Sequence, residues 1–178
     1  MSQFRMVFAP GIIAHEFSHW LSCSLLGVRV HKVEWYGMRA FVQHDHPSPF
    51  NAWLITLAPL LFGQTLGFGL LLYASSFYSV NFLLSLFLAW MGISVLLFSF
   101  PSSHDVSNAF KALQEAYSRN FKKSVFHQLL ALFSLPFVAL PLSVLLAFFW
   151  ILDSVWILRG AWALYAVYFA FQFPAIFL

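Results

Sequence analysis

The feature that most constrains this chain is a series of long apolar runs. They cover residues 4–27, 50–74, 78–100, 125–150 and 156–178. A membrane-spanning helix needs about 20 consecutive apolar residues, and these runs reach that length. Of the 178 residues, 61% are hydrophobic and only 8% are charged, which is more apolar surface than a water-soluble domain of this size needs. We therefore expect an all-α polytopic membrane protein with about five transmembrane helices in a single domain, 1–178.

The interval after the first run predicts a short β-hairpin. Residues 28–49 alternate between apolar and polar side chains, with a turn near Gly37. Elsewhere, the spacing of Gly63 and Gly67 allows two helices to pack closely. Asp153 and Arg159 flank the short interval before the last run, where they are expected to form an ion pair at a membrane edge.

The interval after the third run predicts a polar helix. Residues 101–124 begin with Pro101, which cannot continue the preceding helix. Ser102 or Ser103 can cap the new helix, and Asp105 suits the dipole of its first turn. We expect this segment to lie at the membrane interface as a solvated helix.

The distribution of Lys and Arg predicts the topology of the five-span arrangement. One side of the membrane receives Arg29, Lys32, Arg39, Lys111, Arg119, Lys122 and Lys123, and the other receives Arg5 and Arg159. Cytoplasmic loops carry the excess of positive charge. The hairpin 28–49 and the polar helix 101–124 are therefore predicted to face the cytoplasm, with the N-terminus outside.

Three ionisable residues interrupt the first apolar run at helical spacing. His15 and His19 are one turn apart and project from the same face of a helix, so both imidazoles can bind one metal ion. Glu16 lies beside them, where a carboxylate can take a proton from water at the metal. The alternative is that the three side chains only pack against neighbouring helices. That is costly, because each ionisable group near the bilayer centre costs roughly 2.5–3.5 kcal/mol on insertion scales.

A hydrolytic zinc site needs a third protein ligand. The candidates are His44, Asp45, His46, His104 and Asp105, and less plausibly Glu34, Glu115 or His127. Asp105 is favoured by its position after the helix break at Pro101. His19 is eight residues, or about 12 Å, from the end of the first run, so the segment around Asp105 must dip inward or the site must be reached through a cavity.

The stretch "HEFSHWLSCSLLGVRVHKVEWYG" at 15–37 resembles the first motif region of the site-2 protease family of intramembrane zinc metalloproteases. In that family His-Glu-x-x-His is followed by a small residue, here Cys23, then by a glycine, here Gly27, and a β-forming stretch. "LAPLLFG" at 57–63 resembles the proline-containing middle helix, with Phe62 where the family has asparagine. "FPSSHDVSN" at 100–108 takes the place of the family's aspartate motif.

This resemblance implies a role for each matched residue. His15 and His19 would be zinc ligands, Asp105 the third ligand and Glu16 the general base, with one Zn²⁺ per chain. It also implies a catalytic core of three helices within 1–124, to which the helices of 125–178 are additions. The hairpin would hold an extended substrate segment by adding it to a strand edge.

The expected function is that of an intramembrane zinc metalloprotease, which hydrolyses peptide bonds within or near the membrane helices of substrate proteins. Its partners would be such membrane proteins and the lipid bilayer, and not nucleic acid. One alternative is a membrane zinc protease whose third ligand is Glu115. Another is a non-catalytic metal-binding membrane protein, such as a transporter or a protease-like binding partner. Glu16 argues against this last alternative, because a site that only holds a metal needs no neighbouring base.

Overall fold

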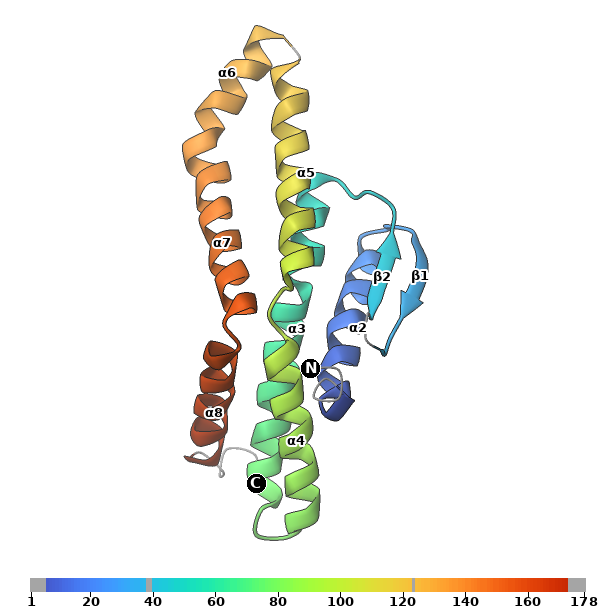
Figure 1. Cartoon of the computed structure of the whole chain (residues 1–178), viewed down its shortest axis with the longest axis vertical. Coiled ribbons are helices and arrows are strands. Elements are labelled where there is room, and N and C mark those ends of the chain that lie inside the picture. Colours follow the sequence, from blue (N-terminus) through green and yellow to red (C-terminus); the bar gives the residue numbers. More distant parts are fainter. Residues whose placement is uncertain (1–5, 38–39, 123, 173–178) are drawn as a thin grey trace.

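The computed structural model describes residues 6–37, 40–122 and 124–172. The described chain is mostly helical, with one antiparallel two-stranded sheet (Figure 1). Its elements are α2 (Ala9–Leu25), β1 (Val30–Glu34), β2 (Phe41–His44), α3 (Pro49–Phe77), α4 (Phe82–Phe98), α5 (Ser103–Phe121), α6 (Val125–Ser134), the π-helical turn η1 (Leu135–Ala139), α7 (Leu140–Ser154) and α8 (Trp156–Gln172).

Three helical segments of the described chain are long and apolar enough to cross a membrane. They are Pro49–Phe77, Phe82–Phe121 and Val125–Ser154, the second combining α4 with α5 and the third combining α6 with α7. The expected first and fifth spans correspond to α2 and α8, which are each 17 residues long. Residues 1–5 and 173–178, which would extend those two spans, lie outside the described chain. The expectation of a mostly helical chain with apolar helices long enough to span a membrane is thus confirmed.

The hairpin and a helix within 101–124 are confirmed as secondary-structure elements. β1 and β2 pair with Val33 opposite Val42 and Glu34 opposite Phe41, and a register shift occurs near Val30. Gly37 has a φ of +138°, a conformation that an L-residue with a side chain rarely adopts, so it suits the turn. The remainder of the turn, at 38–39, lies outside the described residues.

The polar helix α5 begins at a capping box. Of the two serines expected as N-cap, Ser102 has this role, since its side chain accepts a hydrogen bond from the Asp105 amide. The buried face of α5 includes Val106 and Leu113, which belong to a core cluster with Trp53 of α3 and Phe149 of α7. Burial of this apolar stripe holds α5 between α3 and α7.

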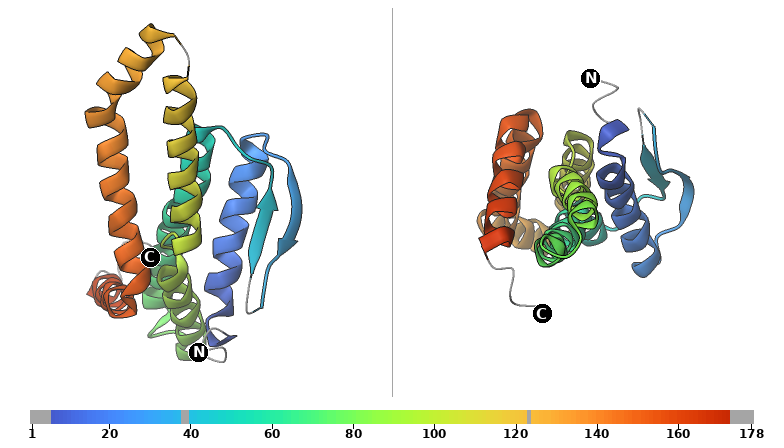
Figure 2. Two further views of the ribbon diagram at one scale, coloured as in Figure 1. Left: turned by 45° about the horizontal axis from the view of Figure 1, so that its top comes forward. Right: turned by 90° about the horizontal axis from the view of Figure 1, so that it is seen from below.

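The elements lie in a row across the molecule (Figure 2). The hairpin lies beside α2, then come α3 and α4, and the α7–α8 segment forms the opposite side. α4 and α5 form one long rod that is interrupted at residues 99–102. A second interruption, at Val155, separates α7 from α8.

Small residues allow α3 and α4 to approach each other closely, and Gly63 and Gly67 are among them. A Cβ atom added at Gly63 would lie 2.5 Å from the Ser99 Cβ, and one at Gly67 would lie 2.6 Å from Leu96 Cγ. A Cβ atom added at Gly92 of α4 would likewise lie 3.0 Å from the Gly67 carbonyl oxygen. The two helices therefore pack backbone against backbone.

Candidate metal centre

The site begins with one face of α2. His15 and His19 are one turn apart, and their Nε2 atoms are 3.2 Å from each other. α2 is held against α4 at Gly11, whose amide donates to the Ser94 hydroxyl at 2.8 Å. A Cβ atom at Gly11 would lie 2.0 Å from the Ser94 carbonyl oxygen, so only glycine permits this approach. The contact brings the histidine face of α2 against the C-terminal end of α4.

Asp105 completes the group from the first turn of α5. Its Oδ2 lies 3.3 Å from His15 Nε2, and its Oδ1 lies 3.3 Å from His19 Nε2. One ligand atom from each of these three residues lies within 4.8 Å of the others, so together they could hold a metal ion. Two imidazole nitrogens and a carboxylate oxygen are donors that Zn²⁺ commonly takes. The residues expected from sequence as ligands thus meet at one point.

The Asp105 carboxylate is itself held in place by the capping box. Its Oδ2 accepts hydrogen bonds from the Ser102 amide at 2.8 Å and from the Ser102 hydroxyl at 2.6 Å. Its backbone carbonyl accepts from the Thr56 hydroxyl of α3 at 3.3 Å. Hydrogen bonds of this kind orient a ligating carboxylate before the metal arrives.

Each histidine donates a hydrogen bond from its other ring nitrogen, Nδ1, to a backbone carbonyl. His15 Nδ1 lies 2.7 Å from the Phe98 oxygen, and His19 Nδ1 lies 2.9 Å from the Ile55 oxygen. A carbonyl oxygen can only accept, so both Nδ1 atoms carry the proton. The Nε2 atoms are then left with their lone pairs directed toward Asp105, which is the tautomer that a metal ligand requires.

Two prolines explain why these carbonyl groups are available. In α3, the Ile55 carbonyl would normally accept from residue 59, but Pro59 has no amide hydrogen. α4 ends at Phe98 because Pro101 cannot continue the helix, which leaves the Phe98 carbonyl without an intrahelical donor. Both prolines are fully buried. The helix interruptions therefore supply the acceptors that orient His15 and His19.

Glu16 shares a cavity with the three candidate ligands. The cavity has a volume of about 1120 Å³, and its walls include residues 40–49, the polar face of α5 and the junction of α7 with α8. Glu16 itself is 8% exposed. A carboxylate on this wall is placed to exchange a proton with water that enters the cavity.

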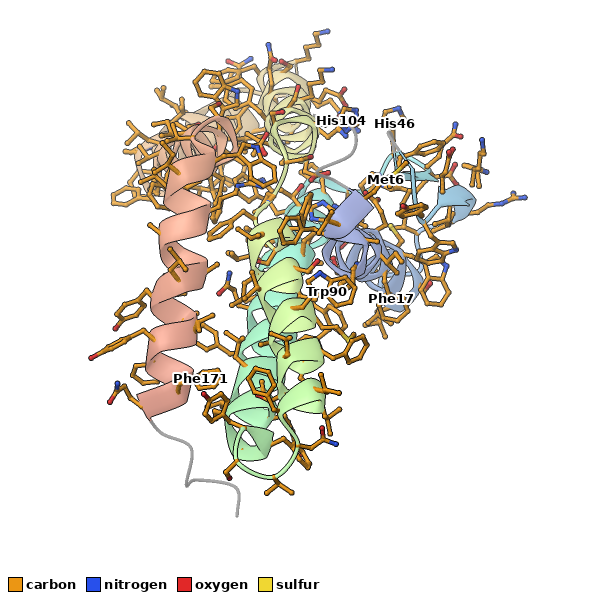
Figure 3. The ribbon with its side chains drawn as sticks, turned by 60° about the horizontal axis from the view of Figure 1, so that its bottom comes forward. Met6, Phe17, His46, Trp90, His104 and Phe171 are labelled. Carbon is orange, nitrogen blue, oxygen red and sulfur yellow. The ribbon has the colours of Figure 1, made fainter. Side chains whose placement is uncertain are left out.

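The other third-ligand candidates lie apart from the histidine pair. His44, Asp45, His46 and His104 line the same cavity, and Figure 3 shows His46 and His104 near each other, one from the segment after β2 and one from α5. His31 is 2.6 Å from Asp45, and this hydrogen bond lowers the pKa of the Asp45 carboxyl from its ordinary value.

The remaining candidates have exposed side chains, although Glu115 also lines the cavity. Glu115, the ligand of the alternative protease type, is paired with Arg119 at 3.0 Å. Glu34 lies on β1 near Lys32, and His127 interacts with the Ser124 hydroxyl on the first turn of α6. None of these three is part of the group that could hold a metal among the described residues.

The sequence interpretation missed one contribution to the site. Asp153 and Arg159 do form the expected ion pair, with 2.6 Å between Arg159 NH2 and Asp153 Oδ1. The pair, however, lies against the α4–α5 interruption, where Asp153 Oδ2 accepts from the Ser103 amide at 2.7 Å. The signal in the sequence was Pro101, which leaves the Leu97 carbonyl of α4 without its usual amide donor.

The chain was also compared with known proteins. No protein-family model matches it, and neither does any curated protein or solved structure.

Proposed function

We propose that this protein is an intramembrane zinc metalloprotease, a divergent and short relative of the site-2 protease family. One observation carries the proposal: two histidines with matching tautomers and one aspartate direct their free donor atoms to a single point, with a glutamate on the same cavity wall. His15, His19 and Asp105 would hold the ion, and Glu16 would handle the proton. In this proposal α2 and α8 also cross the membrane, beside α3 and α4.

The donor set fits zinc. Two imidazoles and one carboxylate are three protein ligands, which leave a further position open, as in catalytic zinc sites. A zinc ion bound there would supply Lewis-acid chemistry, polarising the carbonyl group of the scissile bond and lowering the pKa of water. The same donors also hold Fe²⁺ in other proteins. The identity of the metal is therefore part of the test.

The residues of the chain would divide the remaining work. Glu16 would accept a proton as water attacks the peptide carbonyl, and would then give it to the departing amine nitrogen as the carbon–nitrogen bond breaks. β2 would position the substrate. Its second edge has no partner strand in the described part of the chain, and it belongs to the cavity wall, so an extended segment can pair with it beside the metal.

The test separates metal binding from proton transfer. Glu16→Gln keeps the size of the side chain and removes the base, so zinc content should stay at about one ion per chain while cleavage falls by roughly 10²–10⁴-fold. The matched control is Glu34→Gln, which removes a carboxylate from β1 outside the cavity and should leave both unchanged. Zinc is measured by elemental analysis of detergent-purified protein. Cleavage is measured on a panel of tagged single-span membrane proteins, co-reconstituted in phosphatidylcholine vesicles.

Three results would contradict the proposal. Wild-type protein without zinc would reject the metal site, and a different bound metal would reject the assignment to zinc. Zinc-loaded wild-type protein that cleaves no member of the panel at a rate above that of Glu16→Gln would favour the non-catalytic alternative.

A further inference from the structure

The two interruptions of the helical rods meet at one level of the molecule. The gap between α4 and α5 lies beside the gap between α7 and α8 (Figure 1), and side chains from the second gap reach backbone groups of the first. The helices beyond residue 124 were expected as additions to the catalytic core. At this point they contact the segment that carries Asp105.

Arg159 is the centre of this contact. It is 3% exposed and uses three different nitrogens. NH2 donates to Asp153 Oδ1 at 2.6 Å, Nε donates to the Leu152 carbonyl at 3.0 Å, and NH1 donates to the Leu97 carbonyl at 3.4 Å. Its guanidinium also lies over the rings of Phe100 and Trp156, at 5.6 and 5.5 Å. The side chain is thus held between α8, α7 and the end of α4.

The Leu97 carbonyl needs this donor because of Pro101. An α-helical carbonyl accepts from the residue four positions later, and for Leu97 that residue is a proline without an amide hydrogen. The neighbouring carbonyl, that of Phe98, is the acceptor for His15 Nδ1. Arg159 therefore satisfies the backbone one residue before the group that orients a candidate ligand.

Asp153 contacts the α5 side of the interruption between α4 and α5. Its Oδ2 accepts from the Ser103 amide at 2.7 Å, in the first turn of α5. Ser102, the preceding residue, holds the Asp105 carboxylate through its amide and hydroxyl. A continuous series of contacts thus leads from Arg159 through Asp153 and the start of α5 to Asp105.

We propose that Asp153 and Arg159 are positioning residues for the metal centre, which hold the Phe98 carbonyl and the Asp105 carboxylate at the separation that metal binding requires. The inference rests on the proposed function, and it makes the last two helices part of the metal-binding unit. The pair acts through Ser102, Ser103 and the end of α4, and does not itself touch the metal.

The first test is the zinc affinity of Asp153→Asn in purified full-length protein, measured by competition with a chromogenic chelator. Loss of an outer-shell partner typically costs about 10–100-fold in metal affinity, and we expect a weakening in that range. The control is Ser154→Ala. Ser154 is the next residue on α7, and its hydroxyl donates to the Trp150 carbonyl of the same helix, so zinc affinity should be unchanged.

A second variant guards against a folding defect. Asp153→Asn leaves the buried Arg159 charge without its partner, which can destabilise the fold by itself. Asp153→Leu combined with Arg159→Met removes both charges together with the hydrogen bonds to Ser103 and Leu97, and should also weaken zinc affinity. The melting temperature of the metal-free protein is measured in parallel, together with the visible absorption spectrum of the Co²⁺-loaded protein, which should change because the geometry of the ligands changes.

A double-mutant cycle with Asp105→Ala decides between positioning and general stability. Once the Asp105 carboxylate is gone, most of the effect of Asp153→Asn on zinc affinity should disappear. An equal loss of affinity with and without Asp105 would overturn the inference, as would wild-type affinity in the combined charge-free variant. Wild-type protein that binds no zinc would instead reject the proposed function, and this inference with it.

Discussion

The Asp105 carboxylate has two sets of partners that no other candidate ligand has. It faces the Nε2 atoms of His15 and His19, and it accepts two hydrogen bonds from Ser102 in the capping box. The second set holds the carboxylate at the start of α5, and the first set places it opposite the two histidines. Asp105 is thus both a member of the capping box and a candidate metal ligand.

Substitution of Asp105 should therefore affect metal binding more than substitution of any histidine near the hairpin. Asp105→Ala removes one of three donors, so zinc affinity should fall by more than the roughly 10–100-fold that follows loss of an outer-shell partner. His44→Ala and His46→Ala should leave zinc affinity unchanged. All three variants are compared in folded, detergent-purified protein by chelator competition. Retention of zinc by Asp105→Ala, together with its loss in a histidine variant, would assign the third ligand to the segment after the hairpin.

The residues of the site differ in how well the sequence predicts them. His15, Glu16 and His19 are predictable, because a single helix places them by its own periodicity. Asp105 is far away in sequence and was assigned by the position of Pro101 and by resemblance. The pair of Asp153 and Arg159 was predicted, but its contact with α5 was not, because helical periodicity says nothing about which interrupted rods lie side by side.

At the scale of the elements, prolines within α3 and after α4 determine where the helices offer unpaired carbonyl groups. Pro59 is an interior residue of α3, a position that is unfavourable in a water-soluble helix and better tolerated in a transmembrane one. It removes the usual amide donor of the Ile55 carbonyl, which His19 Nδ1 contacts instead. A proline in α3 thus helps to orient a histidine side chain of α2.

Pro59→Ala should weaken zinc binding. The new amide at position 59 would donate to the Ile55 carbonyl and compete with His19 Nδ1, so we expect a reduction in zinc affinity of up to about tenfold. Pro141→Ala is the control, because Pro141 lies in the first turn of α7 and does not line the cavity. Zinc affinity is again measured by chelator competition. An unchanged affinity in Pro59→Ala would show that the freed carbonyl has no part in orienting His19.

The sequence predicted most elements and left their extents open. Alternation around Gly37 was sufficient for the hairpin, and Ser102 with Pro101 was sufficient for the start of α5. The 40-residue rod over Phe82–Phe121 was not foreseen, because a chain break at a proline does not say whether the two helices stay in line or fold back. That choice depends on the core formed with α3 and α7.

At the scale of the whole molecule, the predicted topology can be tested from the two ends of the helical rods. The connection between α5 and α6 lies at one end of the molecule and the turn between α3 and α4 lies at the other (Figure 1). The charge distribution predicts that the first lies in the cytoplasm. In a Cys23→Ala background, Lys122→Cys should then be shielded from an impermeant maleimide in intact cells.

Val80→Cys is the matched control for this labelling. Val80 is 77% exposed in the turn between α3 and α4, and it should react with the same reagent in intact cells. Both positions should react after the cells are permeabilised. Labelling of Lys122→Cys but not of Val80→Cys in intact cells would invert the topology.

The close contact of α3 with α4 has a consequence for how a substrate enters. At Gly63 and Gly67 the two helices are so close that Ser99 and Leu96 leave no room even for a Cβ atom, so we expect little relative movement of the pair. This pair carries the Ile55 and Phe98 carbonyl groups, so we expect it to act as a rigid frame for the histidines. The wall formed by residues 40–49 is different, because β2 has β1 as its only strand partner in the described chain. We therefore expect the gate of the cavity to be this wall, opening while the metal-binding frame stays still.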